Sequence, residues 1–155
     1  MDQKIILYID DKNNVSKVKI SLNLNPNIFL LKLSPGISPR VLDSLEDYDA
    51  IVIESFGVGG LPEYDGDGGF TKALTRFQQM GKCIALTTQV ENEGSDMIIY
   101  TVGNSLKHDI GIIESYDMTL ESVMTKLMWI LAKTKKQKEI EKLFYTEIHH
   151  DILYR

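Results

Sequence analysis

The stretch Tyr48–Pro62, YDAIVIESFGVGGLP, decides how this chain folds. Within it, Ala50–Ile53 is a continuous apolar run with three β-branched residues, preceded by aspartates and followed by glycines. Such a run is typical of a strand that is buried on both faces, as in a parallel sheet covered by helices. Ligands of open α/β sheets bind beyond the carboxyl ends of the strands, so we expect the Gly57–Gly60 loop to lie at a functional edge.

Apolar patterns on both sides of this stretch predict further strands and helices. Before it, residues 28–33 predict a strand, and Ser38-Pro39 predicts the N-cap and first turn of a short helix. Strands that alternate with helices form parallel βαβ units. We therefore predict a three-layer α/β sandwich with a small, mostly parallel four-stranded sheet. After the stretch, the periodicity predicts helices over about 70–80, from Thr119 to about 131 and over about 140–144, with extended segments over 84–89 and 110–113.

The length of 155 residues suits one domain with a short N-terminal addition. Residues 4–9 and 16–22 are typical of two strands, and the polar cluster 10–14 between them predicts the turn of a β-hairpin. We expect residues 1–24 to form this hairpin and a linker. Residues 25–155 are then expected to form the α/β domain.

Charge and cysteine content exclude several classes of protein. The formal net charge of −5 argues against a surface that binds nucleic acid. The single cysteine, Cys83, rules out an internal disulfide and fits a reducing compartment; we expect it to be buried at the start of a strand. No apolar run approaches the roughly 20 residues of a membrane span, and the N-terminus lacks the pattern of a secretory signal. A cytoplasmic protein without a membrane partner is the resulting prediction.

Three stretches, taken in order, resemble the C-terminal domain of the bacterial type I (cytoplasmic) L-asparaginases. They are IVIESFGVGGLP (Ile51–Pro62), LTTQVENEGSDMIIYTVG (Leu86–Gly103) and DMTLESVMTKLMWIL (Asp117–Leu131). The segment FLLKLSPGISP (Phe29–Pro39) is similar to the first strand and turn of that domain. The resemblance covers the chain from about residue 17 onward, and the combination in order is more specific than a single glycine motif.

The resemblance implies an amidohydrolase that converts L-asparagine and water to L-aspartate and ammonia without a metal or organic cofactor. It also implies that the nucleophilic threonine belongs to an N-terminal domain, and that the site lies at a boundary of a homodimer or homotetramer. The N-terminal threonine motifs of the family are absent from this sequence. We therefore expect no catalytic residue here, and an isolated chain that is inactive. It would be a C-terminal domain cut at the interdomain linker or, less simply, a natural fragment with its own Met1.

The resemblance also implies which residues lie near the substrate or the subunit contact. Taken alone, the glycine loop is equally typical of a tight turn, and the acidic loop after residue 90 of a solvated turn. Many relatives carry Asn where Gly60 stands, so this loop is expected to offer backbone contacts only. A carboxylate in the second loop suits the amino group of an amino-acid ligand. The implied residues are Ser55, Gly57, Gly59, Gly60, Gln89, Glu91, Ser95 and Asp96.

Two alternatives remain open on the sequence alone. The chain could be a free-standing amino-acid-binding or interaction module derived from this fold, or part of the related subunit of an archaeal-type tRNA-dependent amidotransferase. A metal site at His149-His150-Asp151 is disfavoured, because adjacent histidines do not share a helix face and no third ligand has suitable spacing. We expect that segment to be a solvated tail.

Overall fold

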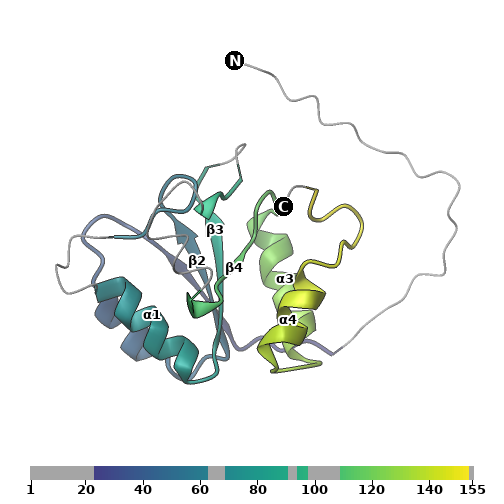
Figure 1. Cartoon of the computed structure of the whole chain (residues 1–155), viewed down its shortest axis with the longest axis horizontal. Coiled ribbons are helices and arrows are strands. Elements are labelled where there is room, and N and C mark those ends of the chain that lie inside the picture. The colour runs from purple at the N-terminus through teal and green to yellow at the C-terminus, as the bar shows by residue number, and fades with distance from the viewer. Residues whose placement is uncertain (1–22, 63–68, 91–93, 98–108, 154–155) are drawn as a thin grey trace, which may run out of the picture.

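The computed structural model describes residues 23–62, 69–90, 94–97 and 109–153 (Figure 1). The N-terminal hairpin predicted over residues 4–22 lies outside the described residues. The strands are β1 (Ile28–Lys32), β2 (Ala50–Ser55), β3 (Cys83–Thr88) and β4 (Ile113–Glu114). The helices are the 3-10 helix η1 (Pro39–Leu45), α1 (Gly69–Gln79), α3 (Leu120–Leu131) and α4 (Gln137–Phe144).

The four strands form one parallel sheet in the order β1-β2-β3-β4. The central strand β2 pairs along its whole length, with Ile51 beside Phe29 on one side and beside Ile84 on the other. Its four apolar residues are fully buried, as the pattern at Ala50–Ile53 predicts. The predicted fold class, an α/β sandwich with a small parallel sheet, is confirmed.

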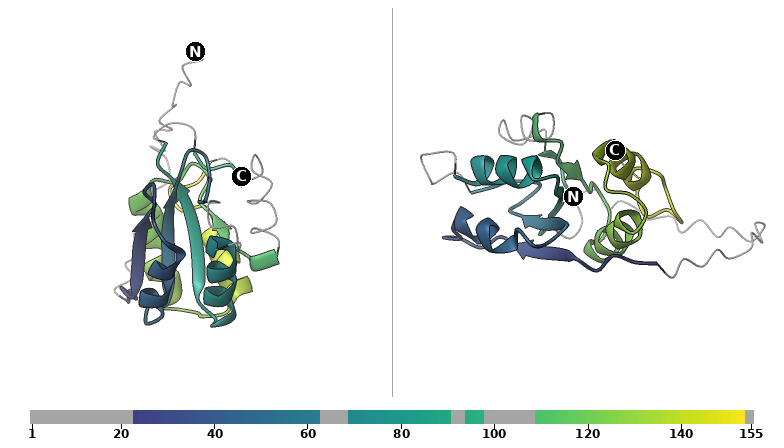
Figure 2. Two further views of the ribbon diagram at one scale, coloured as in Figure 1. Left: turned by 90° about the vertical axis from the view of Figure 1, so that its left-hand side faces the viewer. Right: turned by 90° about the horizontal axis from the view of Figure 1, so that it is seen from below.

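Alternate residues of β2 face opposite layers of the sandwich. Ile51 and Ile53 pack with η1 and α1 in one apolar cluster, whereas Ala50 and Val52 pack with α3 and α4 in the other. This alternation is the two-residue period of a strand with helices on both faces. Figures 1 and 2 show the layers, with α1 on one side of the sheet and α3 and α4 on the other.

Side-chain caps fix where two of the helices begin. The Ser38 hydroxyl accepts a hydrogen bond from the Arg40 N–H at 3.3 Å, with Pro39 at the first helical position. The Thr119 hydroxyl accepts from the Ser122 N–H at 3.3 Å. The sequence predicts both N-caps, because capping depends on residues only two or three positions apart.

The C-terminal segment contradicts its prediction as a solvated tail. Ile152 is only 2% exposed and belongs to the apolar cluster of α3 and α4. The Asp151 carboxylate lies 2.7 Å from the ammonium of Lys126, which is itself buried in α3. The Leu153 N–H donates to the carboxylate of Asp117. The histidines at 149 and 150 are exposed, whereas Asp151 and Ile152 are packed, because their side chains contact residues distant in sequence.

Candidate functional site

The candidate site is the carboxyl edge of the sheet, which lies at the top of Figure 1. The segments that follow all four strands meet there. Gln89, directly after β3, ties three strands together: its side-chain amide donates to the carbonyls of Leu33 at 2.8 Å and Glu54 at 3.1 Å. Its own N–H donates to the Ser55 carbonyl at 3.2 Å. Gln89 is therefore engaged in fixing the edge rather than free to turn toward a ligand.

The glycine loop after β2 is a closed turn. The Phe56 N–H donates to the Gly60 carbonyl at 3.0 Å, and the Gly60 N–H donates back to the Phe56 carbonyl at 2.7 Å. Gly57 and Gly59 have φ values of +48° and +140°, which side chains rarely adopt. A Cβ at Gly59 would lie 3.4 Å from the Cα of Met97. The glycines thus serve both the turn and the close approach of the next loop.

The segment Gly94–Met97 crosses over this turn and is held at three consecutive residues. The Ser95 N–H donates to the Tyr116 carbonyl at 2.8 Å, and the Asp96 N–H donates to the Val58 carbonyl at 2.6 Å. The Met97 N–H donates to the Glu114 carboxylate at 2.6 Å. These bonds bring the two loops implied by the resemblance into contact and leave the Asp96 side chain exposed at the surface.

Serine side chains at this edge differ in what they bond. Ser55 is fully buried, and its hydroxyl donates to the Thr87 carbonyl at 2.6 Å, so it braces β2 against β3. The hydroxyls of Ser95 and Ser115 are buried without a hydrogen-bond partner among the described residues. Buried polar atoms without partners are rare in folded proteins and cluster where strain or function is accommodated.

Glu114 is a residue of this edge that the sequence analysis did not single out. Its side chain is fully buried, and its carboxylate receives the Met97 N–H. A carboxylate directly after the apolar run 110–113 is the feature that could have drawn attention to it. Of the implied site residues, Glu91 lies outside the described residues, and the other seven lie at this edge.

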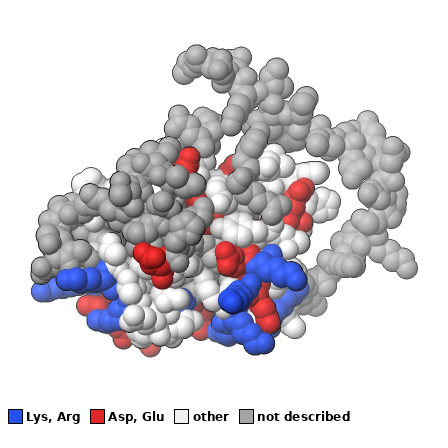
Figure 3. Space-filling model, in the orientation of Figure 1, with Lys and Arg blue, Asp and Glu red and all other residues white. Residues whose placement is uncertain are grey.

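Among the residues that the structure describes, Lys and Arg side chains gather away from the candidate site. Figure 3 shows two groups of Lys and Arg side chains at the lower end of the visible face, one over η1 and α1 and one where α3 joins α4. At that opposite end of the sheet, Lys135 lies 2.5 Å from the Asp49 carboxylate, and its hydrogen bond lowers the pKa of Asp49. At the carboxyl end, Lys32 pairs with Glu54 at 2.8 Å across β1 and β2. This distribution of the described cations does not favour a polyanionic ligand at the candidate site.

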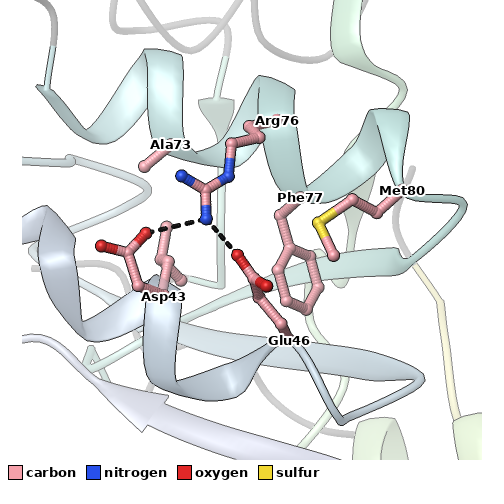
Figure 4. A pocket seen from close by; sticks show the side chains of 7 residues that line it. Asp43, Glu46, Ala73, Arg76, Phe77 and Met80 are labelled. Carbon is pink, nitrogen blue, oxygen red and sulfur yellow. Dashed lines mark hydrogen bonds and ion pairs between the residues drawn. The ribbon is translucent and has the colours of Figure 1, made fainter.

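A shallow depression elsewhere on the surface, between η1 and α1, does not suit a ligand as well (Figure 4). The Arg76 guanidinium bridges the carboxylates of Glu46 and Asp43, and the hydrogen bond that it donates to Glu46 raises the pKa of Arg76. The three charges therefore satisfy one another and leave no unpaired group directed at a ligand. The depression is lined by Leu42, Asp43, Glu46, Ala73, Arg76, Phe77 and Met80.

Metal-binding and membrane-spanning features are absent from the part of the chain that the structure describes. No group of three or more His, Cys, Asp or Glu side chains there could hold a metal ion. His150 pairs instead with Glu147 at 2.8 Å. None of the described helices has the length and apolar character needed to cross a membrane. Cys83 is buried at the start of β3 as predicted, and its burial raises the pKa of the thiol to about 12.

Comparison with known proteins shows that residues 27–144 match the family model of the glutaminase/asparaginase C-terminal domain. The L-asparaginase of Thermococcus kodakarensis is 36% identical over 130 residues, which cover 83% of this chain and 38% of that protein. A glutamyl-tRNA(Gln) amidotransferase subunit from Pyrococcus abyssi is 29% identical over 143 residues, covering 91% of this chain and 31% of that protein. The chain thus spans about a third of the length of these relatives.

Solved structures agree with this similarity. The structure of the thermostable L-asparaginase from Thermococcus kodakarensis superposes with a TM-score of 0.78 at 32% sequence identity, covering 91% of this chain and 44% of that one. L-asparaginase I from Vibrio cholerae gives a TM-score of 0.70 at 23% identity, covering 84% of this chain and 38% of that one. The second likeness shows the shared fold alone.

Proposed function

The chain belongs to the glutaminase/asparaginase C-terminal domain family, and from this premise we propose that it is the C-terminal domain of a type I-like, cytoplasmic L-asparaginase. The proposed reaction is hydrolysis of L-asparagine to L-aspartate and ammonia. In it, this chain supplies subunit contacts and part of the wall around the substrate, and an N-terminal asparaginase domain supplies the nucleophilic threonine. The hydrolysis would need no metal or organic cofactor, because a threonine hydroxyl activated by a neighbouring base forms the acyl intermediate.

One observation carries the proposal: the hydrogen bond from the Asp96 N–H to the Val58 carbonyl, at 2.6 Å. It joins the glycine loop to the Gly94–Met97 segment at the carboxyl edge of a parallel sheet, where ligands of such sheets bind. The Asp96 carboxylate is exposed beside that junction and has the charge needed to contact the ammonium group of an amino acid. The proposal includes the site residues that the resemblance implies. It also includes the division of the chain into residues 1–24 and residues 25–155.

The wall that this chain contributes has a defined chemistry. Gly57, Gly59 and Gly60 offer a surface of backbone, and Gln89 and Ser55 stiffen it through their hydrogen bonds to neighbouring strands. A stiff wall favours catalysis by holding the substrate in one orientation. The proposed assembly is a homodimer or homotetramer in which this edge meets the catalytic half of a neighbouring protomer.

A second candidate function is supported by the similarity to a subunit of the glutamyl-tRNA(Gln) amidotransferases. In that case this chain would be the corresponding domain of such a subunit, and the amide would be that of glutamine. The gene sequence upstream of the first codon distinguishes the two, since each predicts a different preceding domain.

A chimaeric enzyme tests the proposal directly. Residues 25–155 would replace the C-terminal domain of the Thermococcus kodakarensis L-asparaginase, whose structure superposes on this chain. We expect the chimaera to release ammonia from L-asparagine, while the 155-residue chain and the N-terminal domain of that enzyme, each alone, do not. Turnover by the 155-residue chain alone would contradict the assignment of the chemistry to another domain. A folded chimaera without asparaginase activity would contradict the role given to this domain.

Calorimetry separates the proposal from a free-standing binding module. L-asparagine, L-aspartate and L-glutamine would be titrated into the 155-residue chain. If the chain only completes a site on another domain, it should bind none of the three amino acids measurably, because the contacts from that other domain are missing. Saturable binding by the chain alone would favour an amino-acid-binding module instead.

A further inference from the structure

Glu114 is completely buried, and a buried carboxyl group requires a hydrogen-bond partner. Its carboxylate accepts the Met97 N–H at 2.6 Å. Met97 is itself fully buried, so its N–H would lack water if this bond were lost. Residue 97 directly follows the exposed Asp96, and the bond therefore fixes the backbone that presents the Asp96 carboxylate.

Glu114 is in turn fixed through its own backbone. Directly after β4, the Ser115 N–H bonds back to the sheet, to the Leu86 carbonyl at 2.9 Å. The Glu114 N–H bonds instead to the hydroxyl of Tyr145 at 3.1 Å. Alternating residues of a strand direct their N–H groups to opposite sides, and β4 is the last strand of the sheet. The Tyr145 hydroxyl thus takes the place of a further strand.

Tyr145 lies beyond the part of the chain that the family model matches, which ends at residue 144. Its ring packs against Phe144, with centroids 5.6 Å apart, and against Tyr116, with centroids 6.0 Å apart. Tyr116 is the residue whose carbonyl receives the Ser95 N–H at 2.8 Å. Tyr145 therefore contacts the strand end that carries Glu114 and the turn that carries the second anchor of the Gly94–Met97 segment.

From these contacts we propose that Glu114 and Tyr145 are positioning residues of the candidate site, acting on Asp96 through the Gly94–Met97 segment. Of the three anchors of this segment, the Glu114 carboxylate comes from the end of β4, the Tyr116 carbonyl from the turn after it, and the Val58 carbonyl from the glycine loop. The expected effect on substrate binding rests on the proposed function, whereas the expected effect on the backbone of the Gly94–Met97 segment does not.

Amide hydrogen exchange on the 155-residue chain tests the structural part. We expect exchange at Met97 to be about tenfold faster in Glu114→Ala, as the loss of one net hydrogen bond implies. Glu114→Gln keeps an acceptor oxygen and should retain protection close to that of the parent. Amides of the β2–β3 pairing should exchange at parental rates in both variants. Unchanged protection of Met97 in a folded Glu114→Ala variant would overturn the proposal.

Tyr145→Phe keeps the test decisive if Glu114→Ala fails to fold. It removes a single hydroxyl and preserves the ring packing. We expect faster exchange at Glu114 and at Met97, by about fivefold, the typical net effect of one neutral hydrogen bond. Tyr48→Phe is the matched control, since Tyr48 packs against Phe29 on the other face of the sheet and should leave both amides unchanged. Equal exchange at Met97 in Tyr145→Phe and the parent would refute the role of Tyr145.

Kinetics of the chimaera test the effect on substrate. Glu114→Ala and Tyr145→Phe should raise the KM for L-asparagine by about tenfold and about fivefold, with smaller changes in kcat, because a misplaced Asp96 weakens binding. Glu114→Gln should recover most of the KM. Unchanged KM in an active chimaera carrying Glu114→Ala would overturn positioning of the site. Inactivity of the parent chimaera would count against the proposed function alone, because the exchange measurements still decide the structural part.

Discussion

The ammonium of Lys126 lies 2.7 Å from the carboxylate of Asp151, joining the middle of α3 to a residue near the C-terminus. The side chains are only 4% and 15% exposed, so both charges are largely removed from water. The Lys126 ammonium also donates to the Thr146 carbonyl at 2.8 Å and lies 5.7 Å from the centre of the Phe144 ring. The pair therefore fastens the segment after α4 to the helix layer.

Breaking this pair should cost considerable stability. Asp151→Ala leaves a buried ammonium without a counter-charge, and we expect the free energy of unfolding to fall by about 3 kcal/mol in chemical denaturation. Adding Lys126→Met should recover part of the loss, because it removes the unpaired charge. Lys136→Ala, which breaks an exposed ion pair with Glu139, is the control and should leave the midpoint unchanged. Strictly additive effects in the double variant would contradict direct coupling of the two charges.

Two fully buried serines should respond oppositely to removal of their hydroxyls. Ser55→Ala breaks the 2.6 Å bond to the Thr87 carbonyl and leaves that carbonyl with one partner fewer. We expect it to destabilise the chain by about 1 kcal/mol. Ser115→Ala removes a buried hydroxyl that has no partner among the described residues, so it should be neutral or stabilising by up to about 1 kcal/mol. Denaturant titrations give both values, and equal destabilisation would mean that the Ser115 hydroxyl is bonded in solution.

Gly94 should tolerate substitution less well than another glycine of similar φ. Gly94 and Gly36 have φ values of +72° and +86°, so a side chain is strained at both, by about 1–2 kcal/mol. A Cβ at Gly94 would also lie 2.7 Å from the Tyr116 carbonyl oxygen, whereas a Cβ at Gly36 has no neighbour within 4 Å. We therefore expect Gly94→Ala to be the more destabilising variant in thermal unfolding. Equal losses would indicate that the Tyr116 turn moves away without cost.

Burial of Cys83 should make stability fall at alkaline pH. The folded pKa is about 12 and the ordinary value is 9.0, so above pH 9 the unfolded chain loses the thiol proton while the folded chain retains it. This contribution is fully present below pH 9 and is lost as the pH rises toward 12, by about 1.4 kcal/mol per pH unit. Between pH 9 and 10.5, the free energy of unfolding should therefore fall less steeply with pH in Cys83→Ala than in the parent, by about 1.4 kcal/mol per pH unit. An identical slope in the variant would contradict a buried, protonated thiol.

Local patterns explain which parts of the fold were predictable. The run at Ala50–Ile53 identifies a doubly buried strand because every residue in it is apolar, and Ser38 and Thr119 identify helix starts because a cap bonds within three residues. The prediction of a solvated tail at His149-His150-Asp151 agrees with the two exposed histidines but is wrong for Asp151. No local pattern reveals its pairing, because the partner of Asp151 lies 25 residues away in α3.

By itself, the sequence determined the layers of this protein, the order of the strands and helices that the structure describes, and the family to which it belongs. Only the tertiary structure decided that Glu114 holds Met97, that Gln89 ties three strands together, and that Asp96 sits over the glycine loop. The physical reason is the sequence distance over which each kind of interaction acts. Hydrophobic periodicity and capping act between neighbours in the chain, whereas the hydrogen bonds of this edge join segments that only the folded sheet brings together.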